Sequence, residues 1–285
     1  MRSAQLDKEG NAWKTAALYA AWLLAAIFFL APIVWSVANS FKPAAAALAD
    51  PVSLFSQAFS LENYRRLEGV GAGWYTYAAN SVIIALGTVA LTIAVAVPAG
   101  YGFSKFRFPG QTALFIVAMA TLMIPFQSIL TPLFLVLNFL KLQNSLLGLV
   151  LIYATFQLPF SIFMMRNAFD AVPKALIEAA RIDGASQWTI LRRIMMPIAL
   201  PGVATVALFA FLNSWNEFLA ALIFISDQNK FTLPIMLVNV SSGIYGIIDW
   251  GALQAGVTVT MIPCLVLFLL LQRYYVRGLT AGAVK

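Results

Sequence analysis

The sequence contains no histidine, a single cysteine and little charge. Only 10% of its 285 residues are Asp, Glu, Lys or Arg, whereas soluble domains carry about 25%. Without histidine the chain has no His-based metal site or His general base. The lone Cys264 excludes an internal disulfide, and no Gly-x-x-x-x-Gly-Lys-Ser/Thr phosphate loop is present to bind a nucleotide. The composition therefore indicates an integral membrane protein, and no catalytic or metal-binding residues are expected.

Long apolar runs dominate the chain: 61% of the residues are hydrophobic and the mean hydropathy is +0.85. A helix that crosses a bilayer needs about 20 such residues. Six runs approach or exceed that length, at residues 16–37, 75–100, 113–139, 146–165, 202–225 and 252–271. Pro125 and Pro132 interrupt the third run and predict a bend there. The expected fold class is an all-α integral membrane protein with six transmembrane helices.

The Lys and Arg residues are distributed unevenly between the two sides of the predicted spans. Thirteen of the 18 fall in the N-terminal segment 1–15, the loop 101–110, the polar region 166–197 and the tail 272–285. By the positive-inside rule this side is cytoplasmic, and so are both termini. The net charge of +7 then reflects topology and not nucleic-acid binding. Residues 1–285 are expected to form a single transmembrane domain.

The longest polar segment between two apolar runs lies at 173–197 and predicts two short helices joined by a turn. Lys174, Glu178 and Arg181 follow at helical spacing, so they share one face of the first helix. Gly184 permits a sharp turn after it.

The second helix has its own start and end signals. Ser186 can cap it, and Pro197 is expected to end it. Trp188, Leu191 and Ile194 form an apolar stripe between these two residues. A helix-turn-helix between membrane spans is suited to be gripped by another protein, although periodicity alone fits an interfacial amphipathic segment equally well.

Three groups of residues stand at fixed spacing in this region. They are Glu178-Ala179-Ala180, then after two residues Asp183-Gly184-Ala185, and after eight more Ile194-x-Met196-Pro197. This order resembles the EAA motif, which marks the permease subunits of bacterial ABC importers. The one departure is Met196, where the usual pattern has Leu; this is a volume-conserving apolar exchange.

The resemblance covers most of the chain. Four further stretches look like those of carbohydrate importers, of the maltose-type G permease and its glycerol-phosphate and oligosaccharide relatives: LENYRRL, PFQSILTPLF, SWNEFLAAL and RGLTAGAVK. The resemblance implies the type I ABC importer permease fold, with a coupling region at 166–197 between spans four and five. The chain would be a multi-pass subunit of a bacterial inner membrane, not an enzyme. It would form half of the pathway for a sugar, an oligosaccharide or a related polyol or glycerol-phosphate.

The same resemblance implies partners. They are an ABC ATPase dimer that carries ATP and Mg, a second and different permease subunit, and an extracytoplasmic substrate-binding protein. The chain itself is expected to hold no cofactor, and the lipid bilayer surrounds its spans.

The resemblance also implies roles for the motif residues. Glu178 is expected to make the charged contact with the ATPase, Gly184 to hold the turn, and Asp183 to cap or brace it. The alternative for Glu178 is a solvated charge paired with Lys174 or Arg181. Close packing is implied for three small residues, Ala179, Ala180 and Ala185.

Glu217 is the acidic residue that lies well inside a predicted span. Charges within the membrane are costly, so it is expected to face the bundle interior or an aqueous path. Two interpretations stay open: hydrogen bonding to Asn213 or a neighbouring subunit, and a place with Asn213 on the substrate path. In the loop before the last span, Gly243, Tyr245 and Gly246 either reach toward the binding protein, as the resemblance implies, or form a flexible connector.

Three other functions compete with a carbohydrate permease. An ABC importer for another solute, such as an amino acid, would share the motif but not the carbohydrate resemblance. An ion-coupled secondary carrier needs several ionisable groups inside the membrane, whereas this sequence has one such acid. A scaffold that only recruits a cytoplasmic protein would share the motif and lack a substrate pathway.

Overall fold

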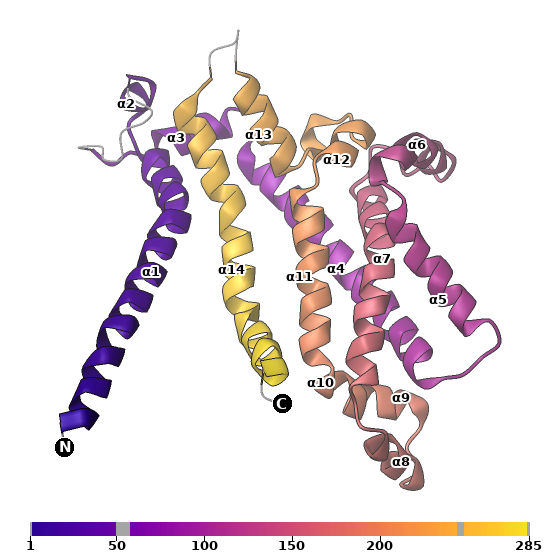
Figure 1. Cartoon of the computed structure of the whole chain (residues 1–285). Helices are drawn as coiled ribbons and strands as arrows, with labels where there is room; N and C mark the ends of the chain where they lie inside the picture. Colours follow the sequence, from indigo (N-terminus) through magenta and orange to yellow (C-terminus); the bar gives the residue numbers. More distant parts are fainter. Residues whose placement is uncertain (1, 50–57, 244–247, 284–285) are drawn as a thin grey trace. The chain divides into compact units, whose positions relative to one another are not determined.

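The computed structural model of the chain describes residues 2–49, 58–243 and 248–283. Every regular element within these residues is a helix (Figure 1). The chain divides into two compact units, Met1–Gly69 with Asn239–Val259 and Val70–Val238 with Thr260–Lys285. The expected all-α fold class is confirmed.

Four helices in the described residues are long and apolar enough to cross a membrane, and two bent pairs of helices raise the number to as many as six. The four are α1 (Arg2–Ser40), α4 (Trp74–Lys105), α7 (Leu146–Asp170) and α14 (Trp250–Ala283). Each contains one of the predicted apolar runs and extends beyond it at one or both ends. The sequence therefore places these spans correctly but underestimates their length.

The third predicted span is broken. It comprises α5 (Gln111–Ala120), the 3₁₀ turns η1 (Thr121–Met123) and η2 (Phe126–Ile129), and α6 (Leu130–Phe139). Its halves meet at 98°. Ile124 is extended, with φ −81° and ψ 115°, because a residue before proline avoids the helical region. The expected bend thus occurs at Pro125, whereas Pro132 fits the first turn of α6, where proline is tolerated.

The fifth predicted span is also interrupted. Its first part is α11 (Leu200–Asn216), and after Glu217 and Phe218 the chain resumes as the short helix α12 (Leu219–Phe224). Glu217 has extended backbone angles, φ −73° and ψ 128°. Its carboxylate accepts hydrogen bonds from the Ala220 and Ala221 backbone N–H groups at 3.0–3.3 Å. The acidic side chain therefore caps α12 and satisfies donors that the break exposes.

The helices α4, α7 and α11 pack against one another in the second unit (Figure 1). Glycines set two of these contacts. A Cβ added at Gly100 of α4 would lie 2.5 Å from the Cβ of Met165 on α7, and one added at Gly202 of α11 would lie 2.6 Å from the Cβ of Ala168. Small residues let membrane helices approach this closely.

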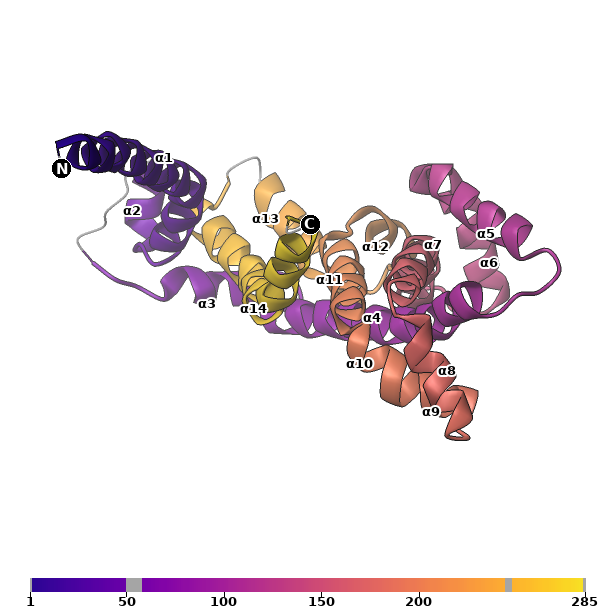
Figure 2. The ribbon, with the colours of Figure 1, turned by 60° about the horizontal axis from the view of Figure 1, so that its bottom comes forward.

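At one end of this bundle the chain folds into a pair of short helices (Figures 1 and 2). The first is α8 (Lys174–Ile182), and the second runs through α9 (Gln187–Ile190), the π-helical turn η3 (Leu191–Met195) and α10 (Met196–Ile198).

The expectation that Pro197 ends the second helix is wrong, because the chain stays helical through it. A 78° bend follows at Ala199, between Gln187–Ile198 and Leu200–Asn216. The wider π turn before Pro197 gives the proline ring room that an α-helical turn would deny it.

The opposite end of α4 is tied to the chain that precedes the last span. The Asn80 side-chain amide donates to the backbone oxygens of Asn229 and Phe231, at 2.8 and 2.9 Å. This holds η4 (Gln228–Lys230) against α4, and the Leu233 N–H donates to Ser81 Oγ where α13 (Leu233–Ser242) begins.

The first unit is held together by polar contacts around α3 (Glu62–Glu68), which follows α1 and α2 (Ala44–Ala49). Asn63 Nδ2 donates to the backbone oxygens of Ser40 and Lys42 at 3.0 and 2.7 Å. Arg66 pairs with Asp249 at 2.7 Å, just before α14. The start of the last span is thus fixed to α3.

The glycine contact between α4 and α7 can be tested by enlarging the side chain. We expect Gly100→Leu to lower the thermal stability of the detergent-purified chain, since forcing methylene groups into a packed contact costs about 1–3 kcal/mol. Gly102→Leu is the matched control, because an added Cβ at Gly102 meets no atom within 4 Å. Equal melting temperatures for the two variants would show that the contact is not tight.

Candidate functional site

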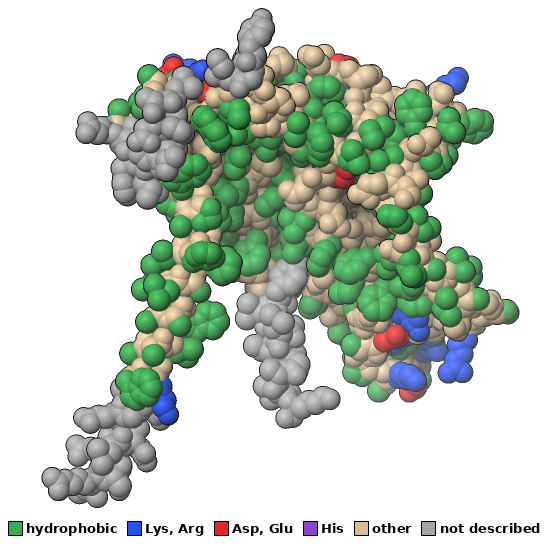
Figure 3. All heavy atoms as spheres, turned by 45° about the horizontal axis from the view of Figure 1, so that its top comes forward, with side chains coloured by type: hydrophobic (Ala, Val, Ile, Leu, Met, Phe, Trp, Pro, Cys, Tyr) green, Lys and Arg blue, Asp and Glu red, His purple; other side chains and the backbone are tan. Residues whose placement is uncertain are grey.

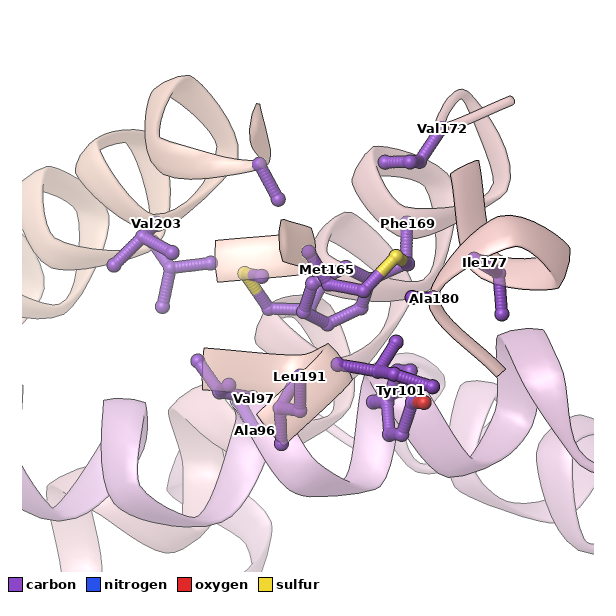
Figure 4. Packing of buried hydrophobic residues seen from close by; sticks show 14 residues of the cluster. Ala96, Val97, Tyr101, Met165, Phe169, Val172, Ile177, Ala180, Leu191 and Val203 are labelled. Carbon is purple, nitrogen blue, oxygen red and sulfur yellow. The ribbon is translucent and has the colours of Figure 1, made fainter. Parts of the chain in front are cut away.

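The paired helices α8–α9 rest on a buried apolar core. Figure 4 shows Met165 and Phe169 of α7, Ala180 of α8, Leu191 of η3 and Tyr101 of α4 gathered in one cluster. Met165 and Phe169 have 0% exposure. Because both helices of the pair contribute to this cluster, the pair is fixed to the ends of α4 and α7 as one body.

The turn between the two helices has the hydrogen bonds of a Schellman motif. The Ala185 N–H donates to Ala180 O at 2.9 Å and the Gly184 N–H to Arg181 O at 3.1 Å. Gly184 has φ +76°, a conformation that residues with a Cβ rarely adopt. Asp183 occupies the C-cap position, and its N–H donates to a carbonyl of the last helical turn. The predicted glycine turn is present.

The second helix begins as expected. Ser186 Oγ accepts a hydrogen bond from the Thr189 backbone N–H at 3.2 Å, which is a standard N-cap. Its next residue, Gln187, accepts a hydrogen bond from the Tyr101 hydroxyl of α4 at 2.9 Å. Tyr101 was not among the residues singled out by sequence, because its partner lies 86 positions away.

The small residues of the motif lie in different environments. Ala179 is exposed, Ala185 is intermediate, and Ala180 is 7% exposed within the core of this chain. Asp183 and Gly184 are exposed at the tip of the turn. A small side chain at Ala180 therefore permits close packing inside the chain, whereas Ala179 offers its surface outward on α8.

Glu178 lies on the face of α8 that borders the end of α4. It lines a cleft of about 260 Å³ together with Lys174 and Arg181 of the same face and with residues 104–107. No salt bridge of 4.0 Å or less includes Glu178 within the described part of the chain. The alternative of an ion pair with Lys174 or Arg181 is therefore not seen, and the carboxylate is exposed.

The apolar side chains of the pair divide between inside and outside. Ile177 is buried, whereas Leu176 is 45% and Ile182 86% exposed. Of the stripe predicted on the second helix, Leu191 is buried and Trp188 is 66% exposed. Exposed apolar groups of this kind mark interaction surfaces. Sequence reasoning missed Ile182; its position opposite Ile177 and Ala180 gives α8 a second apolar side, but the pattern does not say which side is buried.

The two substrate-path candidates belong to a polar contact between α7 and α11. The Tyr153 hydroxyl donates to the Glu217 carboxylate at 2.5 Å. Asn213 Nδ2 donates to Gln157 Oε1 at 2.8 Å, so Asn213 bonds across to α7 and not to Glu217. Tyr153 and Gln157 were missed in the sequence, although their i, i+4 spacing in an apolar run placed both on one helix face.

A cavity of about 540 Å³ lies where the third span breaks, against α7. Its lining is apolar except for Thr121 and Thr155. Both hydroxyls already donate to carbonyls of their own helices, at 2.7 Å. The cavity therefore has little to offer a polar solute.

The remaining candidates are only partly described. Gly243 follows α13 with φ +70°, so it turns the chain out of that helix. Tyr245 and Gly246 lie outside the described residues. Among the residues that the structure covers, no three His, Cys, Asp or Glu side chains gather as a metal site would require.

The chain is similar to known permeases along most of its length. Residues 92–281 match the family described as "Binding-protein-dependent transport system inner membrane component". The diacetylchitobiose uptake system permease protein NgcG of Streptomyces coelicolor is 33% identical, over 94% of this chain and 88% of that protein. The trehalose/maltose transport system permease protein MalG of Thermococcus litoralis is 34% identical, over 92% and 94%.

A solved structure shares the fold. A bacterial ABC transporter involved in the import of the acidic polysaccharide alginate contains a chain that superposes with a TM-score of 0.79 at 23% identity, covering 92% of this chain and 97% of that one. The family match, the full-length relatives and the shared fold agree with the EAA-like order of the paired helices. This chain belongs to the binding-protein-dependent transport system inner membrane components, the permease subunits of ABC importers.

Proposed function

We propose that this chain forms half of the translocation pathway of an importer for a sugar or oligosaccharide, and that a separate ATPase energises it. The substrate class is supported by the names of the relatives, which transport diacetylchitobiose and trehalose or maltose. A related polyol or glycerol-phosphate is the neighbouring substrate class. Neither the apolar cavity beside α7 nor the polar contact between α7 and α11 selects one sugar over another.

The observation that carries the proposal is the attachment of α8–α9 to the bundle. The pair has a buried core with α4 and α7, while Leu176, Ile182 and Trp188 are exposed on it. A partner that gripped this apolar surface would move the transmembrane helices with it, because packed elements shift as bodies. The partner that would bind this surface is an ABC ATPase dimer, which would hold the ATP and Mg.

We propose roles for the motif residues from the EAA-like order and from their positions in the structure. Glu178 would meet the ATPase through its unpaired, exposed carboxylate at the rim of the cleft. Ala179 would let the partner approach α8 closely, and Gly184 with Asp183 and Ala185 would keep the turn in shape. Ala180 would contribute indirectly, because its small side chain allows α8 to pack closely against the buried cluster of this chain.

The other partners and the topology complete the proposal. A second, different permease would supply the other half of the pathway. An extracytoplasmic binding protein would deliver the solute near Gly243, Tyr245 and Gly246. Both termini and α8–α9 would be cytoplasmic, in a bacterial inner membrane, as the distribution of Lys and Arg indicates.

For Glu217 the contacts favour a structural role. Its carboxylate accepts hydrogen bonds from a tyrosine hydroxyl and two backbone N–H groups. A carboxylate committed to these donors has little capacity left for a solute or a transported proton. Asn213 is similarly engaged with Gln157. Glu217 and Asn213 would therefore shape the pathway between α7 and α11 without contacting the sugar themselves.

The assembly can be tested by affinity purification of the tagged chain from native membranes, with mass spectrometry of the proteins that accompany it. We expect an ATPase, a second permease and a binding protein, whose ligand can then be screened among saccharides. If the chain came alone and still drove uptake into liposomes without ATP, it would be a secondary carrier.

The coupling role of Glu178 predicts that Glu178→Ala reduces ATPase recovery and solute uptake severalfold while the chain still inserts into the membrane. Glu68→Ala is the matched control, since Glu68 is an exposed helical glutamate on α3 far along the sequence. ATPase recovery and uptake are measured at equal expression. Wild-type values for Glu178→Ala would remove this residue from the coupling role.

The turn predicts a difference between two substitutions at Gly184. Gly184→Val should weaken assembly with the ATPase, since a left-handed conformation costs a residue with a Cβ about 1–2 kcal/mol. Gly184→Asn should retain most of it, because asparagine tolerates positive φ. An added Cβ at Gly184 meets nothing within 4 Å, so a clash cannot explain the effect. If both variants assembled equally, the turn would not depend on the backbone conformation.

A further inference from the structure

A basic cleft lies between the end of α4 and α8. Its volume is about 260 Å³, and the chain lines it from two directions, with residues 104–107 and with one face of α8. Four cationic side chains border it: Lys105, Arg107, Lys174 and Arg181. Figure 3 shows Lys and Arg side chains gathered at this end of the second unit, with few acidic groups among them.

The cations of this cleft outnumber its carboxylates. None of the four takes part in a salt bridge of 4.0 Å or less within the described residues. Of the two carboxylates in the cleft, Asp170 already accepts a hydrogen bond from Ser104 Oγ at 2.6 Å and pairs with Arg166 at 3.7 Å. Four cations thus face two carboxylates, Asp170 and Glu178, so the cleft keeps an excess of positive charge that attracts anions.

The neighbourhood of the cleft indicates where such an anion comes from. Lys105 ends the apolar helix α4, so the cleft lies at the depth where a membrane span leaves the hydrocarbon core. The next residues along the chain include Phe106 and Phe108, which are 40% and 39% exposed. Exposed apolar side chains beside basic groups at a span end fit the boundary between the hydrocarbon core and the lipid headgroups. A free anion would need no such apolar border.

We propose that this cleft binds the phosphate group of an anionic phospholipid. Its phosphodiester would lie among the guanidinium and ammonium groups, and its acyl chains would run along Phe106 and Phe108 into the bilayer. Basic pockets at the cytoplasmic ends of membrane helices recognise lipid headgroups in this way. The ammonium and guanidinium groups of the cleft attract phosphate oxygens through their positive charge. A bound lipid would bridge α4 and α8, and the site does not depend on the proposed transport function.

The test is native mass spectrometry of the purified full-length chain in detergent, titrated separately with phosphatidylglycerol, phosphatidylcholine and inorganic phosphate. We expect one phosphatidylglycerol to be retained per chain, in clear preference to phosphatidylcholine. Excess inorganic phosphate should displace it weakly. If inorganic phosphate bound as tightly as phosphatidylglycerol, the cleft would be a phosphate site and the assignment to a lipid would be wrong.

Two double variants distinguish lipid binding by the cleft from binding through general surface charge. Lys105→Gln with Arg107→Gln should weaken phosphatidylglycerol binding by about tenfold or more, since each basic residue near an anionic headgroup contributes about fivefold. Arg192→Gln with Arg193→Gln removes the same charge from exposed residues outside the cleft and should leave binding unchanged. Equal losses in the two double variants would overturn the proposal.

A further variant guards against misfolding. Lys105→Arg with Arg107→Lys keeps both charges and should bind phosphatidylglycerol within about threefold of wild type. Elution as a single species in size-exclusion chromatography is required of every variant. Loss of binding in this charge-preserving variant, with normal elution, would show that the two basic groups do not act through their charge.

Discussion

The structure depends on the packing of Met165 and Phe169 against the inner sides of α8 and η3. Two short helices with few residues each would not persist alone, because a helix of under about 12 residues is marginal in water. Burying Ala180 and Leu191 against the end of α7 replaces the stability that length would give. The buried cluster therefore both creates the paired helices and determines which of their side chains stay outside.

A second constraint is the satisfaction of polar groups inside the apolar bundle. The break between α11 and α12 frees backbone N–H groups that lipid cannot bond. Glu217 accepts two of them, and Tyr153 donates its hydroxyl to the same carboxylate. The acid that first suggested an aqueous path is thus required by the geometry of its own helix. Asn213 and Gln157 extend the contact one turn further.

Features with a local cause were predictable from the sequence. The apolar runs, the bend at Pro125, the glycine turn at 184 and the Ser186 cap all follow from short-range patterns. The failures share a different origin. Glu217, at the break after Asn216, accepts a hydrogen bond from Tyr153, which lies 64 positions away. The exposure of Ile182 depends on which side of α8 meets α7, and periodicity gives two apolar sides without ranking them. Pro197 lies within its helix and not at the end of it, and a π turn precedes it.

The paired helices are joined to the bundle twice, through 171–173 to α7 and through Ala199 to α11. Because the pair is connected to both helices, a movement of the pair is transmitted to α7 and α11 together. Displacing it rotates both helices together or shears them past each other. The facing sides of those helices carry the Tyr153–Glu217 and Gln157–Asn213 bonds. Sliding α7 along α11 would stretch both hydrogen bonds at once. The two bonds would therefore resist that movement until the displacing force was large enough to break them.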